Sequence, residues 1–498
     1  MLYRPGPHLR MWDTWMFCEG DDFHLFTLTQ PYGKPSWDRV CHAVTSDWIN
    51  WRECPDIILQ GGGGEWDSSG VLTGSTFRTA DGYGMTYGSR HMDREKIGLL
   101  FSRDLNTWTK YPGNPVLSPS GPYYEESPGE VSHNTVQWRD AYVIRENNTY
   151  EAFICAGDPE KPKTLNGCVA RVTSTDLIDW EYHPPIASPG RYLDMEVPQY
   201  FRMNGFHYIL FSTSGIYRHI NLPSREIATG TFYLMAEDKY GDYRVPEDNM
   251  LIGSGQGRFD CYVGKVIETD EGLLLYHHIC GYRTAFASPK TVRQNTDGTL
   301  CLERWKGMDN LKGEKQVDLS SSGQVLRASG KYPVGAWHRD GDILKGEAGP
   351  AMSAWIFDRL PGDFAAECTV DVSGAARAGV IFRIQDSDVR SERGWAVSID
   401  RERSRIELCR PVLQCRTSLR LDPLDVIYGP VPEKCTIEIF MRDSYIEVYV
   451  SRCPCFILNA SVVTASEHAK DGKFGIFVEN GSAGFASLCV REIPGSEF

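Results

Sequence analysis

Three acidic residues lie among aromatic or apolar neighbours, where a carboxylate needs a specific reason. Asp13 stands between two tryptophans in the segment 10–15, Asp140 directly precedes the apolar run 141–144, and Glu196 lies in the largely apolar segment 193–201. Carboxylates embedded among aromatic rings are typical of sugar sites, because rings stack on the apolar faces of a sugar and acids bind its hydroxyls. The three acids are therefore candidates for glycoside chemistry.

Each acid also has a structural interpretation when it is taken alone. Asp13 fits an exposed turn, and Asp140, which follows Arg139, fits an ion pair at a strand edge. The apolar neighbours of Glu196 would raise its pKa, as a general acid requires. The chemical interpretation gains its weight from the three residues together.

Several other chemistries lack their usual sequence support. The chain has no Gly-x-x-x-x-Gly-Lys loop, no Gly-x-Gly-x-x-Gly segment after a strand, no Gly-x-Ser-x-Gly elbow and no His-Glu-x-x-His helix. The glycine runs at 61–64 and 253–257 lack the following helix or lysine that phosphate binding needs, so they are predicted to be flexible loops. No ligand cluster argues for a metal, and we expect neither a metal nor a cofactor.

Composition restricts the class of partner. The 498 residues carry a net charge of −14, which disfavours nucleic acid and anionic membranes as partners. The 15 cysteines are irregularly spaced and the start of the chain has no apolar signal segment, so we expect reduced thiols and a cytoplasmic protein. The expected partner is a disaccharide or oligosaccharide substrate, and the oligomeric state stays open.

The elements that must position these acids are predicted to be strands. Short apolar runs alternate with clusters of Gly, Pro, Asn and Asp, and no long stretch has helical periodicity, so the chain is expected to be all-β. The segments 45–51, 102–108 and 174–180 repeat the pattern Ser/Thr-x-Asp-Leu/Trp-x-x-Trp after an apolar strand. One such turn per four-stranded unit favours the blades of a β-propeller over unrelated hairpins.

The length of the chain predicts two domains. We expect the propeller over residues 1–315, a polar linker over 316–332 and a β-sandwich over 333–498, where strands such as 437–441 and 445–450 alternate as a hairpin.

The contexts of the three acids resemble those of glycoside hydrolase family 32, the β-fructofuranosidases, over nearly the whole chain. Arg139-Asp140-Ala141 is similar to the Arg-Asp-Pro motif of the family and Glu196-Val197-Pro198 to its Glu-Cys-Pro motif. Residues 24–26, 42–51, 66–75 and 262–265 resemble further family motifs, and Trp12-Asp13-Thr14-Trp15 resembles the nucleophile segment of the related family 68 levansucrases. The resemblance implies a five-bladed propeller followed by a β-sandwich.

The resemblance also implies a mechanism. Asp13 is the expected nucleophile, Glu196 the acid/base and Asp140 the stabiliser of the transition state, in a retaining hydrolysis that releases terminal β-fructofuranosyl units from sucrose or fructo-oligosaccharides. Retention requires the nucleophile and the acid/base to lie about 5 to 5.5 Å apart. The predicted substrate-binding residues are Trp12, Trp15, Gln30, Trp66, Asp67, Thr73, Ser75 and Arg139.

The chain departs from the family pattern around the acids. Ala141 and Val197 replace Pro and Cys of the two motifs, and the glutamine near the first strand appears as Leu28, with Gln30 two places on. These changes keep the acids and alter the residues around them. A fructosyltransferase, a furanosidase for arabinofuranosyl or galactofuranosyl units, and a non-catalytic carbohydrate-binding propeller therefore stay as alternatives.

Overall fold

The protein consists of two compact units of β-structure. The computed structural model describes residues 3–91, 94–126, 136–215, 220–281, 283–325, 335–358, 360–384, 394–414, 418–460 and 472–495. The first unit comprises Met1–Ile220, Thr229–Gly253 and Cys261–Cys301, and the second comprises Asn221–Ala228, Ser254–Asp260 and Leu302–Phe498. The described chain is strands apart from one short 3-10 helix, which confirms the all-β prediction. No helix in these ranges has the length and apolar character needed to cross a membrane.

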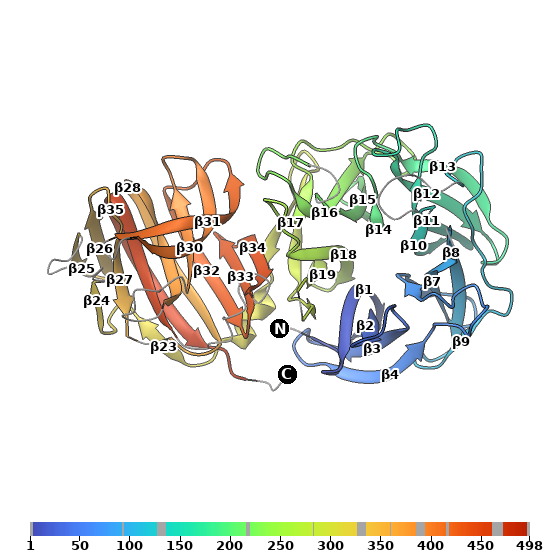
Figure 1. Ribbon diagram of the computed structural model, residues 1–498, viewed down its shortest axis with the longest axis horizontal. Coiled ribbons are helices and arrows are strands. Elements are labelled where there is room, and N and C mark those ends of the chain that lie inside the picture. Colours follow the sequence, from blue (N-terminus) through green and yellow to red (C-terminus); the bar gives the residue numbers. More distant parts are fainter. Residues whose placement is uncertain are drawn as a thin grey trace. The chain divides into compact units, whose positions relative to one another are not determined.

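The first unit is a five-bladed β-propeller, as the resemblance implied (Figure 1). Each blade is one antiparallel sheet whose strands follow one another along the chain. The strands of blades 1 to 3 are β1 (Leu9–Glu19), β2 (Asp22–Pro31), β3 (Arg39–Thr45) and β4 (Arg52–Ile58); β5 (Val71–Leu72), β6 (Thr76–Arg78), β7 (Tyr83–His91), β8 (Arg94–Ser102) and β9 (Trp108–Lys110); and β10 (Trp138–Glu146), β11 (Thr149–Gly157), β12 (Gly167–Ser174) and β13 (Glu181–Ala187).

The strands of blades 4 and 5 are β14 (Glu196–Met203), β15 (Phe206–Thr213), β16 (Thr229–Ala236) and β17 (Met250–Ser254); and β18 (Cys261–Thr269), β19 (Gly272–Ile279), β20 (Ala285–Phe286), β21 (Lys290–Gln294) and β22 (Leu300–Arg304). Strands β1, β10, β14 and β18 begin their blades and lie on the inner side of the ring (Figure 1). Buried apolar side chains fill the space between adjacent blades, such as Phe26 with Tyr87 and Leu99 with Ala152. Side chains near the propeller axis are therefore held between packed sheets.

The three repeated turns join the third and fourth strands of blades 1, 2 and 3. In the turn of blade 2, Asp104 accepts hydrogen bonds from the backbone N–H groups of Asn106 and Thr107, at 2.9 and 2.7 Å. Leu105 adopts a left-handed φ of 62°, and the indole of Trp108 donates to its carbonyl at 2.9 Å. The aspartate thus caps the turn as the sequence pattern predicted.

The second unit is a β-sheet domain with one large hydrophobic core. Its elements are η1 (Lys306–Leu311), β23 (Lys315–Asp318), β24 (Gly323–Val325), β25 (Ala336–Asp340), β26 (Ile343–Ala348), β27 (Ser353–Phe357), β28 (Phe364–Ile384), β29 (Trp395–Asp400), β30 (Arg405–Gln414), β31 (Ser418–Tyr428), β32 (Lys434–Arg442), β33 (Tyr445–Val450), β34 (Cys453–Asn459) and β35 (Lys473–Glu492). The long strands β28 and β35 pair along nearly their whole length, and β28 pairs β32 at its start and β29 at its end. Strands β32 and β33 form the predicted hairpin.

The boundary between the units differs from the predicted one. The second unit begins at Leu302 and also includes the two segments 221–228 and 254–260, which come from the propeller part of the sequence. The first part of the predicted linker forms β23 and β24 within the second unit, and residues 326–332 lie outside the described ranges. The polar composition of this stretch reflects short strands with partly exposed side chains.

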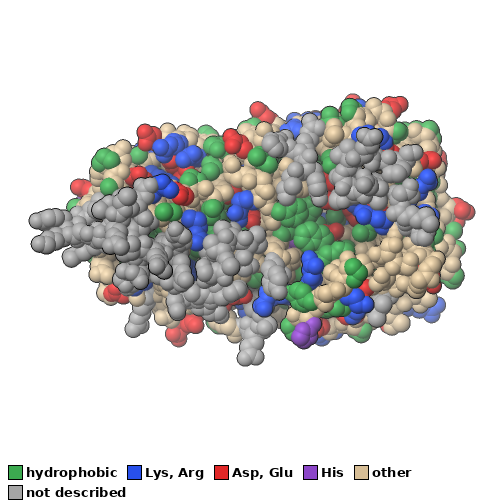
Figure 2. Space-filling model, in the orientation of Figure 1, with side chains coloured by type: hydrophobic (Ala, Val, Ile, Leu, Met, Phe, Trp, Pro, Cys, Tyr) green, Lys and Arg blue, Asp and Glu red, His purple; other side chains and the backbone are tan. Residues whose placement is uncertain are grey.

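Both signs of charge are spread over the described part of the face shown in Figure 2. Figure 2 shows acidic and basic side chains interspersed on the visible face, with hydrophobic side chains gathered near the middle of the propeller. The net charge of −14 is therefore not concentrated in one patch on this face.

Candidate active site

The three predicted acids lie at backbone irregularities of three inner strands. The pairing of β1 with β2 shifts register between Met11 and Thr14, that of β10 with β11 between Arg139 and Tyr142, and that of β14 with β15 after Glu196. β-bulges of this kind redirect side chains and occur often beside active sites. The bulges thus place Asp13, Asp140 and Glu196 at corresponding points of three different blades.

Two of these bulges contain strained residues. Asp140 has a φ of 61° and Val197 a φ of 49°, a left-handed conformation that costs about 1–3 kcal/mol for a residue other than glycine. The backbone N–H of Val197 donates to Oδ2 of Asp140 at 3.0 Å, so the bulge of β14 holds the carboxylate of β10. This contact fixes Asp140 relative to Glu196, the neighbour of Val197.

Arg139 is a buried cation surrounded by four carboxylates. Its Nη1 donates to Glu95 at 3.0 Å and its Nη2 to Oε1 of Glu196 at 2.8 Å. Its Nε lies 3.5 Å from Asp140, and its Nη2 lies 4.0 Å from Asp194. Arg139 therefore holds the surrounding acids in position. The sequence predicted that Arg139 binds the substrate, but its guanidinium donates hydrogen bonds to Glu95 and Glu196.

Glu196 is oriented by a second donor from blade 5. The hydroxyl of Tyr262 donates to Oε2 of Glu196 at 2.5 Å, while Arg139 binds Oε1. Both carboxyl oxygens are thus fixed in direction. About a fifth of the side chain stays accessible to solvent, as a group that exchanges protons with substrate and water requires.

Asp13 is held from blade 2. The hydroxyl of Thr73 donates a short hydrogen bond to Oδ2 of Asp13. The Oδ1 atom is buried and has no hydrogen-bond partner among the described residues, although part of the residue is reached by solvent. Thr73 thus anchors one carboxyl oxygen of Asp13, and the other has no such anchor among the described residues.

Burial and mutual repulsion raise the pKa values of several carboxyls in the cluster. Burial raises the pKa of Asp13 to about 7; Thr73 lowers it, Glu196 raises it, and Lys265 and Arg139 lower it. Burial, followed by the charge of Glu196, also raises the pKa of Asp194 to about 7, and burial raises the pKa of Asp140 well above its usual range. Carboxyls this close share protons, so the cluster keeps some of its acids neutral near pH 7.

Other predicted site residues have structural surroundings. The indole of Trp15 is almost fully buried and donates to Thr76 at 3.1 Å, so it belongs to the core between blades. Asp67 is paired with Lys110 at 2.6 Å and accepts from Tyr87 at 2.8 Å. These hydrogen bonds and this ion pair thus join both side chains to residues other than the three acids.

The remaining predicted residues divide into two groups. Gln30 donates to the carbonyl of Lys34 at 2.8 Å, and Trp66 packs on Tyr87 with ring centroids 5.4 Å apart. Both side chains thus stabilise the structure near them. Trp12, beside Asp13, is half-buried and packs 5.1 Å from the ring of His278. Of the predicted tryptophans, Trp12 adjoins Asp13 in sequence and is partly exposed, whereas Trp15 lies in the core between blades.

Ser75 acts on the bulge of β10. Its hydroxyl donates to the carbonyl of Ala141 at 2.8 Å and accepts from the N–H of Val143 at 3.0 Å. The side chain is buried and bridges Ala141 and Val143, the first and third residues after Asp140. Ser75 therefore supports the position of Asp140 from the neighbouring blade.

Two acids of the cluster were not among the predicted site residues. Glu95 accepts from Arg139 and from the N–H of Trp138, and Asp194 accepts from the hydroxyl of Thr213 at 2.9 Å. Glu95, Ile97 and Leu99 are spaced two residues apart, so they lie on the same face of a strand. The two apolar neighbours indicate that this face is buried, and this signal could have revealed Glu95. Asp194 offered no comparable periodicity.

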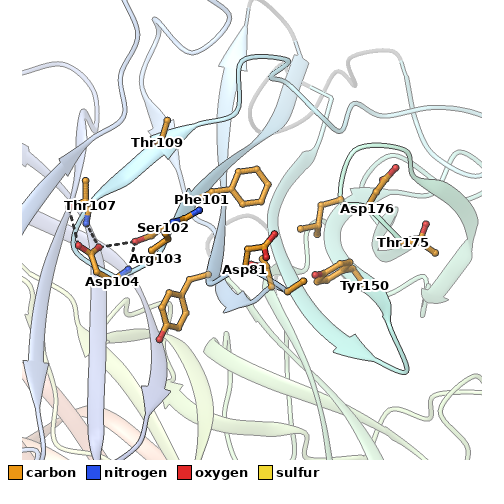
Figure 3. A pocket seen from close by; sticks show the side chains of 14 residues that line it. Asp81, Phe101, Ser102, Arg103, Asp104, Thr107, Thr109, Tyr150, Thr175 and Asp176 are labelled. Atoms are coloured by element: carbon orange, nitrogen blue, oxygen red, sulfur yellow. Dashed lines mark hydrogen bonds between the residues drawn. The ribbon is translucent and has the colours of Figure 1, made fainter.

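A cavity of about 710 Å³ lies away from these acids, where the turns of blades 2 and 3 approach each other (Figure 3). Its carboxylates include Asp104 and Asp176, which cap the repeated turns. The turn geometry explains these two acids, and the remaining carboxylate of the cavity is Asp81. In the described part of the chain, no group of three or more His, Cys, Asp or Glu side chains is arranged to hold a metal ion.

The sequence matches a family model for most of the propeller. Residues 14–272 match the model "Glycosyl hydrolases family 32 N-terminal domain". The chain belongs to glycoside hydrolase family 32. This match covers the inner strands β10, β14 and β18 completely and begins one residue after Asp13, within β1.

Curated relatives of family 32 share parts of the sequence. A levanase from Bacillus sp. (strain L7) is 29% identical over 180 residues, which are 33% of this chain and 17% of the levanase. A raffinose invertase from Escherichia coli is 25% identical over 229 residues, which are 42% of this chain and 43% of the invertase. The chain thus aligns with less than half the length of each of these two proteins.

Solved structures share the fold over nearly the whole chain. The sucrose-6-phosphate hydrolase from Lactobacillus gasseri superposes with a TM-score of 0.66 at 15% identity and covers 97% of this chain and 91% of that one. The β-fructofuranosidase BmSUC1 from Bombyx mori superposes with a TM-score of 0.62 at 17% identity and covers 98% and 94%. These likenesses confirm the predicted arrangement of a propeller followed by a C-terminal β-sheet domain.

Proposed function

We propose that this protein is a retaining β-fructofuranosidase that releases terminal fructosyl units from sucrose or fructo-oligosaccharides. The observation that carries the proposal is the convergence of Asp13, Asp140 and Glu196, each at a bulged inner strand. Arg139 pairs with Asp140 and Glu196, and Asp13 interacts electrostatically with Glu196 and Arg139. Family 32 membership and relatives named as a levanase and a raffinose invertase support fructosides as the substrate class. Structures titled as complexes with sucrose and with 1-kestose point to the same sugars.

In the first step, Oδ1 of Asp13 attacks the anomeric carbon of the fructosyl unit. The bond between that carbon and the leaving oxygen breaks, and protonated Glu196 gives its proton to this oxygen. Oδ1 is suited to the attack because Thr73 anchors the other oxygen of Asp13. The product is a fructosyl ester of Asp13 and a free alcohol.

In the second step, the Glu196 carboxylate removes a proton from water, and the water oxygen attacks the same carbon. The ester bond breaks, which regenerates the Asp13 carboxylate, and Glu196 regains its proton. Tyr262 and Arg139 keep the Glu196 carboxyl in one orientation through both steps. Asp140 neither attacks nor transfers a proton; the bulge of β14 holds its oxygen where it stabilises positive charge on the ring.

The test is hydrolysis by the purified full chain of sucrose, sucrose 6-phosphate, raffinose, 1-kestose, inulin and levan, with released sugars separated by chromatography. Aryl arabinofuranosides and galactofuranosides test the other furanoses, and transfer products at high sucrose reveal a transferase. We expect fructose from at least one fructoside and none from Asp13→Asn. Fructose release that persists in Asp13→Asn, or no release by the wild-type protein, contradicts the proposal.

Stereochemistry is tested separately with methanol as acceptor. Two displacements at one carbon retain configuration, so we expect methyl β-fructofuranoside. The α-anomer would contradict the covalent intermediate on Asp13.

A further inference from the structure

Blade 5 contributes a buried lysine that the mechanism has not used. Lys265 lies on β18, which shifts register between Tyr262 and Lys265 as the other three bulged inner strands do. The residue is 1% exposed, and its Nζ has no hydrogen-bond partner among the described residues. A buried ammonium without such bonds is costly unless it interacts with opposite charge.

The position of Lys265 is fixed by its neighbours. Val263 has a left-handed φ of 54°, and its N–H donates to Ser212 at 3.1 Å. The N–H of Gly264 donates to Thr231 at 2.7 Å, and a Cβ on Gly264 would meet the same hydroxyl at 2.8 Å, so only glycine fits there. The bulge of β18 is thus a rigid support for the residue that follows it.

The groups that face Lys265 come from three strands. Asp13 on β1 and Asp140 on β10 interact with it electrostatically, and its Nζ lies 5.6 Å from the ring centroid of Tyr142, also on β10. Tyr276 is its partner in the register of β19, and the Tyr276 hydroxyl oxygen accepts a hydrogen bond from the backbone N–H of Met16 in blade 1 at 3.0 Å. The two carboxylates are the anions to which the ammonium responds.

Asp13 needs a cation of its own. A nucleophilic carboxyl must be ionised, but burial raises the pKa of Asp13 to about 7. Arg139 is already shared by Glu95, Asp140, Asp194 and Glu196. Burial lowers the pKa of Lys265 to about 8, while Asp140 and Asp13 raise it, so the lysine is charged near neutral pH.

We propose that Lys265 is a positioning residue for the fructosyl-transfer step, whose ammonium holds Asp13 and Asp140 in their carboxylate forms. This role rests on the proposed function, because it concerns ionisation of the nucleophile. A lysine with a merely structural role would affect folding and leave the pH dependence of the reaction in place.

The test compares Lys265→Met with the wild-type full chain. The methionine has nearly the same volume without the charge, so the carboxyls gain protons more easily. We expect the acidic limb of kcat/KM against pH to move up by about one unit, with about a tenfold loss at pH 6. Raising the pH to 8 should return most of the activity, and KM should change little. Pre-steady-state release of the leaving group should show the same shift.

Lys290→Met is the matched control. Lys290 is also buried in blade 5, and its ammonium donates to the carbonyl of Ser288 at 2.7 Å. We expect this variant to lose stability and to keep the wild-type pH profile. If Lys265→Met does not fold, Lys265→Gln and the charge-retaining Lys265→Arg provide the same contrast, with a shift expected for Gln alone.

An acidic limb that stays in place in the uncharged variants, or that moves equally in Lys290→Met, would overturn the role of Lys265. A wild-type protein without activity on fructosides would instead contradict the proposed function. The two failures are therefore distinguishable in one series of assays.

Discussion

The propeller and the C-terminal domain each contain a cluster of charges built around buried carboxyls, and the two clusters are balanced differently. In the propeller, the cations Arg90, Arg139 and Lys265 face five carboxyls: Asp13, Glu95, Asp140, Asp194 and Glu196. In the C-terminal domain, Arg377, Arg403 and Arg405 pair with three carboxyls: Asp400, Glu407 and Glu479.

The difference in charge balance suits the propeller cluster to proton transfer and the C-terminal cluster to stabilising the fold. The propeller cluster has two carboxyls more than cations. Binding protons to the excess carboxyls lowers the free-energy cost of burying uncompensated negative charge. Protons held in this way near neutral pH are available for transfer. The balanced cluster has no such excess, and its ion pairs connect β28, β29 and β30.

The largest expected effect is the loss of the nucleophile. Asp13→Asn should lower kcat/KM for the preferred fructoside by about 10⁴-fold, because the amide cannot form the ester intermediate. Initial rates of fructose release measure this. Asp104→Asn, which keeps a capping oxygen in a turn far along the chain, is the control and should stay within twofold of wild type. Comparable losses in both variants would remove the distinction between a reacting acid and a turn cap.

The balanced cluster should respond through stability. Glu407→Gln removes the buried anion that Arg377 and Arg405 share and leaves them the longer pairs with Glu479 at 3.6 Å and Asp400 at 3.5 Å. It should cost about 3 kcal/mol of unfolding free energy. Urea unfolding followed by tryptophan fluorescence and circular dichroism measures it. Asp422→Asn removes an exposed pair with Arg420 and should cost under about 0.5 kcal/mol. Equal, small costs for both would show that burial of the cluster contributes little.

Removing one of the excess carboxyls of the propeller cluster should stabilise the protein, in contrast to removing Glu407. The folded pKa of Asp194, about 7, lies above its unfolded value, so its ionisation destabilises the fold increasingly as pH rises from 4 to 7. Asp194→Asn removes this cost, and its amide oxygen still accepts from Thr213. We expect an increase of about 2 kcal/mol, or about 4 °C in Tm, at pH 7.5 and almost none at pH 4.5.

Asp67→Asn is the control for this pH dependence. Asp67 is equally buried in the propeller but is paired with Lys110, so its loss should not stabilise the protein at either pH. A gain in Tm for Asp194→Asn that is the same at both pH values would show that the cause is packing.

The sequence predicted the parts of this comparison that depend on local pattern. Alternation and the repeated Asp turns indicated an all-β propeller, and the contexts of Asp13, Asp140 and Glu196 selected three acids that the structure brings into one cluster. The bulges that aim them are properties of register between strands, which one strand's sequence does not show.

Long-range partners explain the remaining differences. Asp67 and Trp15 have the residue types of a sugar site, but Lys110 and Thr76, distant in sequence, give them structural roles. Two propeller segments join the second unit through contacts such as Arg225 with Asp425 at 2.8 Å, which moves the boundary away from the polar stretch after residue 315.

The smallest expected effect concerns Ser75, for which sequence and structure give different roles. A substrate-binding serine would raise KM when it is removed, whereas a serine that braces the bulge after Asp140 would lower kcat. We expect Ser75→Ala to lower kcat about tenfold with little change in KM, because the N–H of Val143 loses its acceptor and Asp140 its fixed position. The stability cost should be about 1 kcal/mol.

Ser89→Ala separates the local effect from a general one. Ser89 is a buried serine of the same blade whose hydroxyl donates to the carbonyl of Gly70. It should cost similar stability and leave both kinetic constants unchanged. A rise in KM for Ser75→Ala at constant kcat would instead support the role predicted from the sequence, in which Ser75 binds the substrate.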